Sequence, residues 1–156
     1  MGKTWIQIEI SNNGSIRETA VTEIELKQEV FADAAALSSG LTSSGHIVAS
    51  GILFDTGKAD VKPESAAALK EIAKLLNQNP KLKLYIVGHT DNAGALEGNI
   101  DLSKRRAAAV VQTLTSQYAI APARLQPFGD GPYAPLASND SEDGRSLNRH
   151  VELVKQ

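Results

Sequence analysis

The sequence predicts an α+β fold in which a βαβαββ order of elements forms a two-layer sandwich, a mixed sheet with two helices on one face. Two segments predict the helices, because apolar residues recur in them at the spacing of a buried helix face. These residues are Leu69, Ile72, Ala73 and Leu76 in the first segment and Ala107, Val110, Val111 and Leu114 in the second. Short apolar runs bounded by turn residues flank both segments and are typical of strands.

The first quarter of the chain, residues 1–44, is predicted to be an extension made of a strand hairpin and a helix. Residues 4–10 alternate between apolar and polar types, as a half-buried strand does. A turn at 11–15 and an extended segment at 20–24 complete the hairpin. Residues 25–38 have a helical pattern that a Ser-Ser-Gly stretch ends. A two-stranded hairpin is marginally stable alone, so we expect it to pack within the same chain.

The rest of the chain, residues 45–156, is predicted to be the main domain. It begins with a strand at 47–54, bulged at Gly51, and a helix from Pro63 to Leu76. The later elements are a strand at 83–87, a helix at 102–118 and strands at 125–128 and 149–154, with turn-rich loops at 129–132 and 138–146.

Composition excludes several classes of function. The chain has 156 residues, 42% hydrophobic and 22% charged, which is the range of globular domains. A net charge of −2 and only 4% aromatic residues argue against nucleic acid as a partner. The absence of cysteine excludes disulfides, thiolate metal sites and a cysteine nucleophile. No apolar run approaches the roughly 20 residues of a membrane span, and no signal peptide opens the chain.

The most informative stretch runs from Gly88 to Ala107. A predicted strand leads into it and a predicted helix leads out, with Asp91 at the strand end and Arg106 near the start of the helix. An acid and a base that face each other across such a crevice suit a small zwitterion, since the acid takes its ammonium and the base its carboxylate. The free N–H groups of a helix N-terminus would also favour the anion.

The phase of this helix separates two neighbouring arginines. Arg105 points nearly opposite the apolar face and should be solvated. Arg106 falls on the flank of that face, so its stem can lie on the core while its guanidinium turns into a cleft. The alternative is an arginine at the core edge that pairs with an acid inside the protein.

Other polar residues offer no convincing catalytic set. His89 and Asp91 could form an acid/base couple or a metal pair, and Asp55 and Asp60 could join Asp91 in a carboxylate cluster. The histidines lack ligand-like spacing, however, and loop aspartates usually shape turns. No nucleophile motif or phosphate-binding loop is present. We therefore expect binding rather than catalysis, with no cofactor and no functional metal.

Two further residues have open roles. Asn99 could hold its loop through backbone hydrogen bonds or present its amide to a ligand. Arg149 shares a strand face with Val151 and Leu153 by alternation, so it could add a second positive charge to the site. Alternatively, Arg149 forms a salt bridge that ties the final loop to the sheet.

Four strings make residues 45–155 resemble the OmpA-like peptidoglycan-binding domain, in the family's order and with similar spacing. They are Phe54-Asp55-Thr56-Gly57-Lys58-Ala59, Gly88-His89-Thr90-Asp91 with Gly94, Asn99 through Leu102-Ser103 to Arg106-Ala107, and Asn139 with Gly144-Arg145-Ser146-Leu147-Asn148-Arg149-His150-Val151. The first 44 residues lie outside the resemblance.

The resemblance implies a non-catalytic, periplasmic module of the bacterial envelope, associated with the outer membrane and bound non-covalently to the cell wall. Its ligand would be the diaminopimelate of the peptidoglycan stem peptide, with Asp91 on the ammonium and Arg106 on the carboxylate. Asn99, Arg149 and the Thr56-Gly57 loop match positions around the same pocket. A signal peptide would be absent from the chain as given.

Two positions depart from the family pattern. Many members carry a second arginine where this chain has His150, and some carry a polar side chain where it has Gly57. Two other functions stay open. One is a hydrolase of wall peptides that uses His89 and Asp91, and the other is an assembly module in which residues 1–44 bind an envelope protein or a second copy of the chain.

Overall fold

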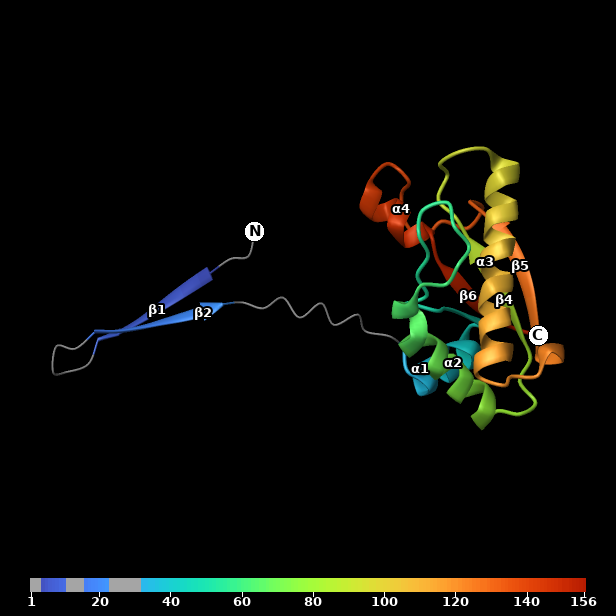
Figure 1. Cartoon of the computed structure of the whole chain (residues 1–156), viewed down its shortest axis with the longest axis horizontal. Helices are drawn as coiled ribbons and strands as arrows, with labels where there is room; N and C mark the ends of the chain where they lie inside the picture. The colour runs from blue at the N-terminus through green and yellow to red at the C-terminus, as the bar shows by residue number, and fades with distance from the viewer. Residues whose placement is uncertain (1–3, 11–15, 23–31) are drawn as a thin grey trace.

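The computed structural model describes residues 4–10, 16–22 and 32–156, with side chains from residue 32 onward (Figure 1). Strands β1 (Thr4–Ile10) and β2 (Ile16–Thr22) form an antiparallel two-stranded sheet of their own. The hairpin is therefore confirmed, although β2 begins before the predicted 20–24 segment. The predicted turn at 11–15 and residues 25–31 of the predicted helix lie outside the described residues.

A four-stranded mixed sheet forms the main domain. Its strands are β3 (His46–Val48), β4 (Leu84–His89), β5 (Leu125–Gly131) and β6 (Val151–Lys155), in the order β3-β6-β4-β5. Strands β4 and β5 run parallel, whereas β6 pairs antiparallel with both β3 and β4. The parallel pair requires a crossover, which α3 (Leu96–Gln117) supplies by lying along both strands (Figure 1).

Three helices lie on one face of this sheet: α3, α1 (Ala34–Ser43) and α2 (Ala66–Gln78), which a 3-10 turn η1 (Pro63–Ser65) precedes. Of these, α2 and α3 are the predicted pair. The short helix α4 (Glu142–Asn148) contributes nothing to this core, and a second turn, η2 (Pro122–Arg124), precedes β5. Alternate strand residues face the helices, and one apolar core holds Leu84, Ile86, Val151 and Leu153 together with α1, α2 and α3. Among the helices of the described residues, none has the length and apolarity to cross a membrane.

Helix α1 differs from the helix predicted at 25–38. Asp33 caps its start, since Oδ1 accepts a hydrogen bond of 2.8 Å from the Ala36 N–H. Gly40 lies inside the helix and does not end it. A glycine is favoured there because a Cβ would come within 2.6 Å of Ile47 on β3. Leu37 and Leu41 are buried in the main core. Helix α1 thus packs with the sheet domain, although the sequence placed residues up to 44 in the extension.

The predicted strand at 47–54 is also shorter than expected, since β3 ends at Val48. The chain turns at Gly51, whose φ of +88° is one that glycine adopts without strain. Phe54 then forms an isolated bridge with Val61 instead of continuing the sheet. The segment after β3 is therefore a loop that is free to fold over the end of the sheet.

Two helix predictions need correction near the site. Helix α3 starts at Leu96 rather than at residue 102. No side chain caps its first turn, and that turn contains Gly98, so the sequence gives no sign that a helix begins there. Helix α4 replaces the predicted loop at 138–146. Ser141 caps it by accepting a 3.1 Å hydrogen bond from the Gly144 N–H. Strand β6 consequently begins at Val151, and Arg149 lies before it.

Candidate functional site

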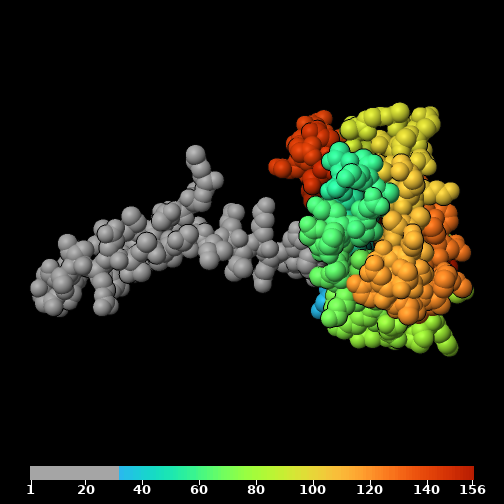
Figure 2. Space-filling model, viewed as in Figure 1, coloured from blue at the N-terminus to red at the C-terminus, as the bar shows by residue number. Residues whose placement is uncertain are grey.

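Three segments that are distant in the sequence meet at one end of the sheet. They are the loop after β3, the β4–α3 loop with the first three turns of α3, and α4 before β6. Figure 2 shows the loop, the start of α3 and α4 gathered on one end of the domain. The Asp91 and Arg106 positions come from the second segment and Arg149 from the third.

Asp91 is bonded inside the protein on both carboxylate oxygens. Oδ1 accepts from the Ala93 N–H at 3.0 Å, and Oδ2 accepts from Nη1 of Arg149 at 2.6 Å. The other terminal nitrogen of Arg149 donates to Glu142 at 2.8 Å. The hydrogen bond to Asp91 raises the pKa of Arg149, and Arg149 in turn lowers the pKa of Glu142. Arg149 thus forms the salt bridges that tie the final loop to the rest of the domain, and it also lies in the candidate site.

Arg106 is buried, with 2% of its surface exposed, because the loop after β3 covers this flank of α3. Nε donates to the Lys58 carbonyl at 3.0 Å and Nη2 to the Asp55 carbonyl at 3.3 Å, while the guanidinium lies 5.0 Å from the Phe54 ring centre. Ten residues separate Arg106 from the start of α3, about 15 Å along the axis. The prediction that the N–H groups of the helix N-terminus act on the anion beside Arg106 is therefore wrong.

One guanidinium nitrogen of Arg106 makes no hydrogen bond among the described residues. This nitrogen, Nη1, is buried. Burial lowers the pKa of Arg106 and Arg149 lowers it further, whereas Asp91 raises it. The group nevertheless stays charged, because arginine does not deprotonate in proteins. A buried charged donor without an acceptor is costly, so this nitrogen favours an incoming anion.

A small cavity of about 110 Å³ opens between the two arginines. Its lining consists of Ile52, Leu53, Phe54, Arg106, Ser146 and Arg149. A water takes about 30 Å³ of liquid volume, so the cavity matches a few waters or the charged end of one side chain. Its lining offers two guanidinium groups, and the Asp91 carboxylate lies next to it through the bond to Arg149.

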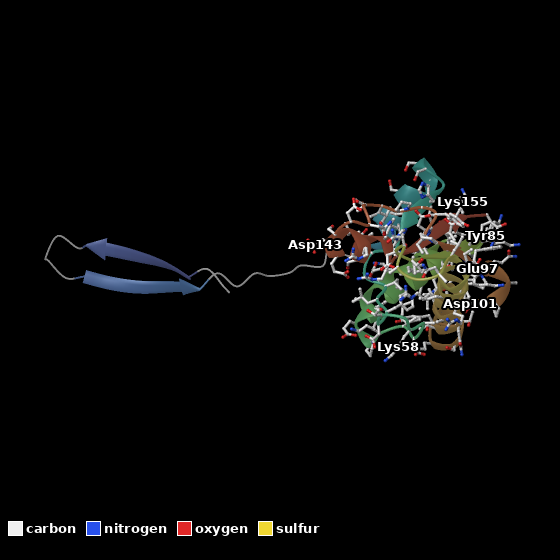
Figure 3. All side chains as sticks on the ribbon, turned by 90° about the horizontal axis from the view of Figure 1, so that it is seen from above. Lys58, Tyr85, Glu97, Asp101, Asp143 and Lys155 are labelled. Atoms are coloured by element: carbon white, nitrogen blue, oxygen red, sulfur yellow. The ribbon has the colours of Figure 1, made fainter. Side chains whose placement is uncertain are left out.

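Asn99 and the Thr56-Gly57 turn have supporting positions. The Asn99 amide donates to the carbonyls of Ala93 at 3.0 Å and Asp91 at 3.4 Å, which is the structural role considered for it. Thr56 and Gly57 are exposed, outside the cavity lining. Their turn is held by Arg106 through the carbonyls of Asp55 and Lys58, and the Lys58 side chain lies at the rim of the domain (Figure 3).

The proposed carboxylate cluster is wrong for Asp55, which instead pairs with Lys58 at 3.3 Å and Lys62 at 3.6 Å. Within the described ranges, no group of three His, Asp or Glu side chains is placed to hold a metal. His89 has no bond to Asp91 and stacks on His150, with ring centres 4.2 Å apart.

Sequence reasoning missed Glu142, Phe54 and Ser146. Glu142 lies seven residues before Arg149, a spacing that places both on one side of a helix. Recognition of the Ser141 cap would have revealed that helix. The approach of Phe54 to Arg106 carries no sequence signal, because loop packing brings them together.

Comparison with known proteins identifies relatives of this chain. The probable lipoprotein YiaD of Escherichia coli is 35% identical over 66% of this chain and 47% of its own. The peptidoglycan-associated lipoprotein of Pseudomonas aeruginosa is 37% identical over 65% of this chain and 60% of its own. The chain spans about half or less of the first curated relatives it matches, including 29% of the P. aeruginosa outer membrane porin F.

Solved structures show the same fold. The peptidoglycan-associated lipoprotein of Burkholderia pseudomallei matches with a TM-score of 0.62 and 30% identity, over 67% of this chain and 88% of that one. The type VI secretion cell wall anchor of P. aeruginosa matches with a TM-score of 0.59 and 27% identity, over 77% and 94%. The model of the OmpA family matches residues 53–149. The chain therefore belongs to the OmpA family.

Proposed function

We propose that this domain binds peptidoglycan non-covalently and without catalysis, through the diaminopimelate of the stem peptide, and so anchors an envelope protein to the cell wall in the periplasm. The observation that carries the proposal is the unpartnered Nη1 of Arg106, buried beside a cavity that Arg149 also lines. The names of two relatives, a peptidoglycan-associated lipoprotein and a cell wall anchor, support it.

The chemistry of the ligand fits the three charges. The side chain of diaminopimelate ends in an ammonium and a carboxylate on one carbon, a zwitterion. Its carboxylate would accept from Nη1 of Arg106 and from Arg149, and its ammonium would donate to Asp91. The ammonium must share or replace the 2.6 Å bond of Asp91 to Arg149, while Glu142 retains the other Arg149 nitrogen.

The supporting residues keep this arrangement in place. Asn99 fixes the backbone of Asp91 and Ala93, and thereby the direction of the Asp91 carboxylate. The turn that contains Thr56 and Gly57 would contact the stem peptide through its backbone, next to the carbonyls that hold Arg106.

Sedimentation with purified peptidoglycan sacculi tests the proposal. Asp91→Asn preserves shape but removes the charge, so binding should fall at least tenfold, because loss of one partner of a desolvated charge pair costs about 2–5 kcal/mol. Asp101→Asn is the matched control, since Asp101 is exposed on the outer side of α3 (Figure 3).

Free diaminopimelate should displace the protein, whereas Nα-acetyl-lysine amide should not, because its blocked α-carbon leaves an ammonium without a carboxylate. Undiminished sedimentation of Asp91→Asn, or equal displacement by the blocked lysine, would contradict the proposed contacts. Release of soluble muropeptides by the pure protein would instead support the hydrolase alternative.

The assembly alternative concerns residues 1–44. A two-stranded sheet is marginally stable alone, which favours a partner for the β1-β2 hairpin. Sedimentation equilibrium of the full chain and of a chain that begins at Ala32 distinguishes the two functions. A change from dimer to monomer with unchanged affinity for sacculi would assign assembly to the hairpin.

A further inference from the structure

Two stacked histidines lie on the same two chain segments as the partners of the Asp91–Arg149 ion pair. His89 ends β4 two residues before Asp91, and His150 follows Arg149 at the entry to β6. Their rings are nearly parallel, with an interplanar angle of 7° and centres 4.2 Å apart. The N–H of His89 also donates to the His150 carbonyl at 2.9 Å. The stack therefore joins the two backbone segments that carry the ion pair.

Both rings are buried, with 2% of His89 and 8% of His150 exposed. His89 lies between two carboxylates, since Nδ1 is 3.7 Å from Asp130 of β5 and Nε2 is 3.6 Å from Glu152 of β6. The opposite oxygen of Glu152 is 3.2 Å from His46 of β3.

His150 has a different environment. Its Nδ1 lies 3.1 Å from the Asn148 carbonyl, and its Nε2 has no partner among the described residues. A proton on Nε2 would therefore find no acceptor, and the resulting charge would lie next to Arg149 in the chain and against the ring of His89.

The two rings cannot both be charged without strain. The first proton is accommodated on His89, because its two nitrogens lie 3.7 Å and 3.6 Å from carboxylates that attract the charge, although neither nitrogen has a hydrogen-bond partner among the described residues. A second proton on His150 places two positive charges face to face in a buried stack. Such a pair titrates as a coupled unit. Burial lowers the pKa of both rings, and His89 lowers that of His150 further, so both are neutral near pH 7.

We propose that His89 and His150 are positioning residues that hold Asp91 and Arg149 in register while neutral, and that their protonation separates the two segments and weakens wall binding. The inference rests on the proposed peptidoglycan function for its binding readout. The geometry also predicts a readout that needs no ligand, namely a change in the ion pair itself.

The experiment compares the full chain with His150→Phe, which keeps a flat ring on His89 but cannot take a proton, and with His46→Phe as control. His46 is exposed at the edge strand and shares Glu152 with His89, so this variant removes the third histidine and shows whether it contributes through that carboxylate. NMR titration from about pH 7.5 to pH 5 follows the imidazole, Asp91 carboxyl and Arg149 guanidinium signals. Sacculus sedimentation is measured at the same pH values.

In the parent and in His46→Phe, the Asp91 and Arg149 signals should shift together with the imidazoles, and binding should fall about tenfold. His150→Phe should keep most of its binding at the lower pH. Asp91 and Arg149 signals that ignore the imidazole titration, or equal acid loss in His150→Phe, would overturn the inference. If the parent does not bind sacculi at any pH, the proposed function fails, and the NMR arm alone decides the positioning role.

Discussion

Asp91 and Arg149 are joined by a 2.6 Å bond between Oδ2 and Nη1, which links the end of β4 to the end of α4. The acid of the proposed site is therefore already neutralised when no ligand is bound. An incoming ammonium must compete with Arg149 for this carboxylate. The second bond of Arg149, to Glu142, consequently bears on the affinity.

Glu142→Gln should weaken sacculus binding by up to about fivefold. Glutamine holds Arg149 less firmly, so Arg149 pairs more fully with Asp91 and opposes the ammonium. The effect stays small because ion pairs exposed to water contribute little. Glu97→Gln, at an exposed position in the first turn of α3, is the matched control for sedimentation. Tighter binding of Glu142→Gln would show that Glu142 competes for Arg149 without aiding the ligand.

Arg106→Ala should destabilise the fold as well as abolish binding. It removes two bonds to the carbonyls of Asp55 and Lys58 and the contact with Phe54, at a cost of about 3 kcal/mol. Urea unfolding measures this cost. Arg106→Lys keeps a charge but lacks the planar fork, so it should retain more stability and still bind poorly. Normal sedimentation of Arg106→Lys would mean that the fork is not used by the ligand.

Arg105→Ala should leave both stability and wall binding nearly unchanged. Arg105 is exposed and pairs with Asp101 at 2.8 Å one turn away, an arrangement worth about 0.5 kcal/mol or less. Sedimentation beside Arg106→Lys checks the result. A loss of binding in Arg105→Ala as large as in Arg106→Lys would place the ligand on the outer side of α3.

Stability should fall as the pH drops below about 6.5, the ordinary pKa of histidine. Burial lowers the pKa of His89 and His150 in the folded state, so the unfolded chain binds protons first and acid favours unfolding. Urea unfolding at about pH 7.5 and pH 5.5 measures the loss, in a window above the titration of ordinary carboxyls. His150→Phe should lose less stability than the parent, and equal losses would count against a buried neutral pair.

Truncation should separate the hairpin from the domain. Removal of residues 1–44 deletes α1, whose Leu37 and Leu41 belong to the core, and each such loss costs about 2–5 kcal/mol. A chain that begins at Ala32 keeps α1 and its Asp33 cap, and should unfold in urea close to the full chain. Equal stability of a chain that begins at Gly45 would show that α1 is not needed for the core.

The sequence by itself determined the sheet domain, the faces of α2 and α3, and the exposure of Arg105. These features follow from the periodicity of apolar residues, because each element must bury one face. The same periodicity could not locate the start of α3 or the short helix α4, where weak caps and a glycine hide the boundaries. It also placed α1 too early, since Gly40 serves a close approach to Ile47 rather than the end of the helix.

Tertiary structure alone decided how the site residues meet. Local phase placed Arg106 at the flank of its helix, but the loop after β3 closes over it and buries it beneath the carbonyls of Asp55 and Lys58. The ion-pair partner of Asp91 is Arg149, which lies 58 residues later in the chain. Such contacts depend on the packing of distant segments, and their energy is shared among many residues, so no local pattern in the sequence encodes them.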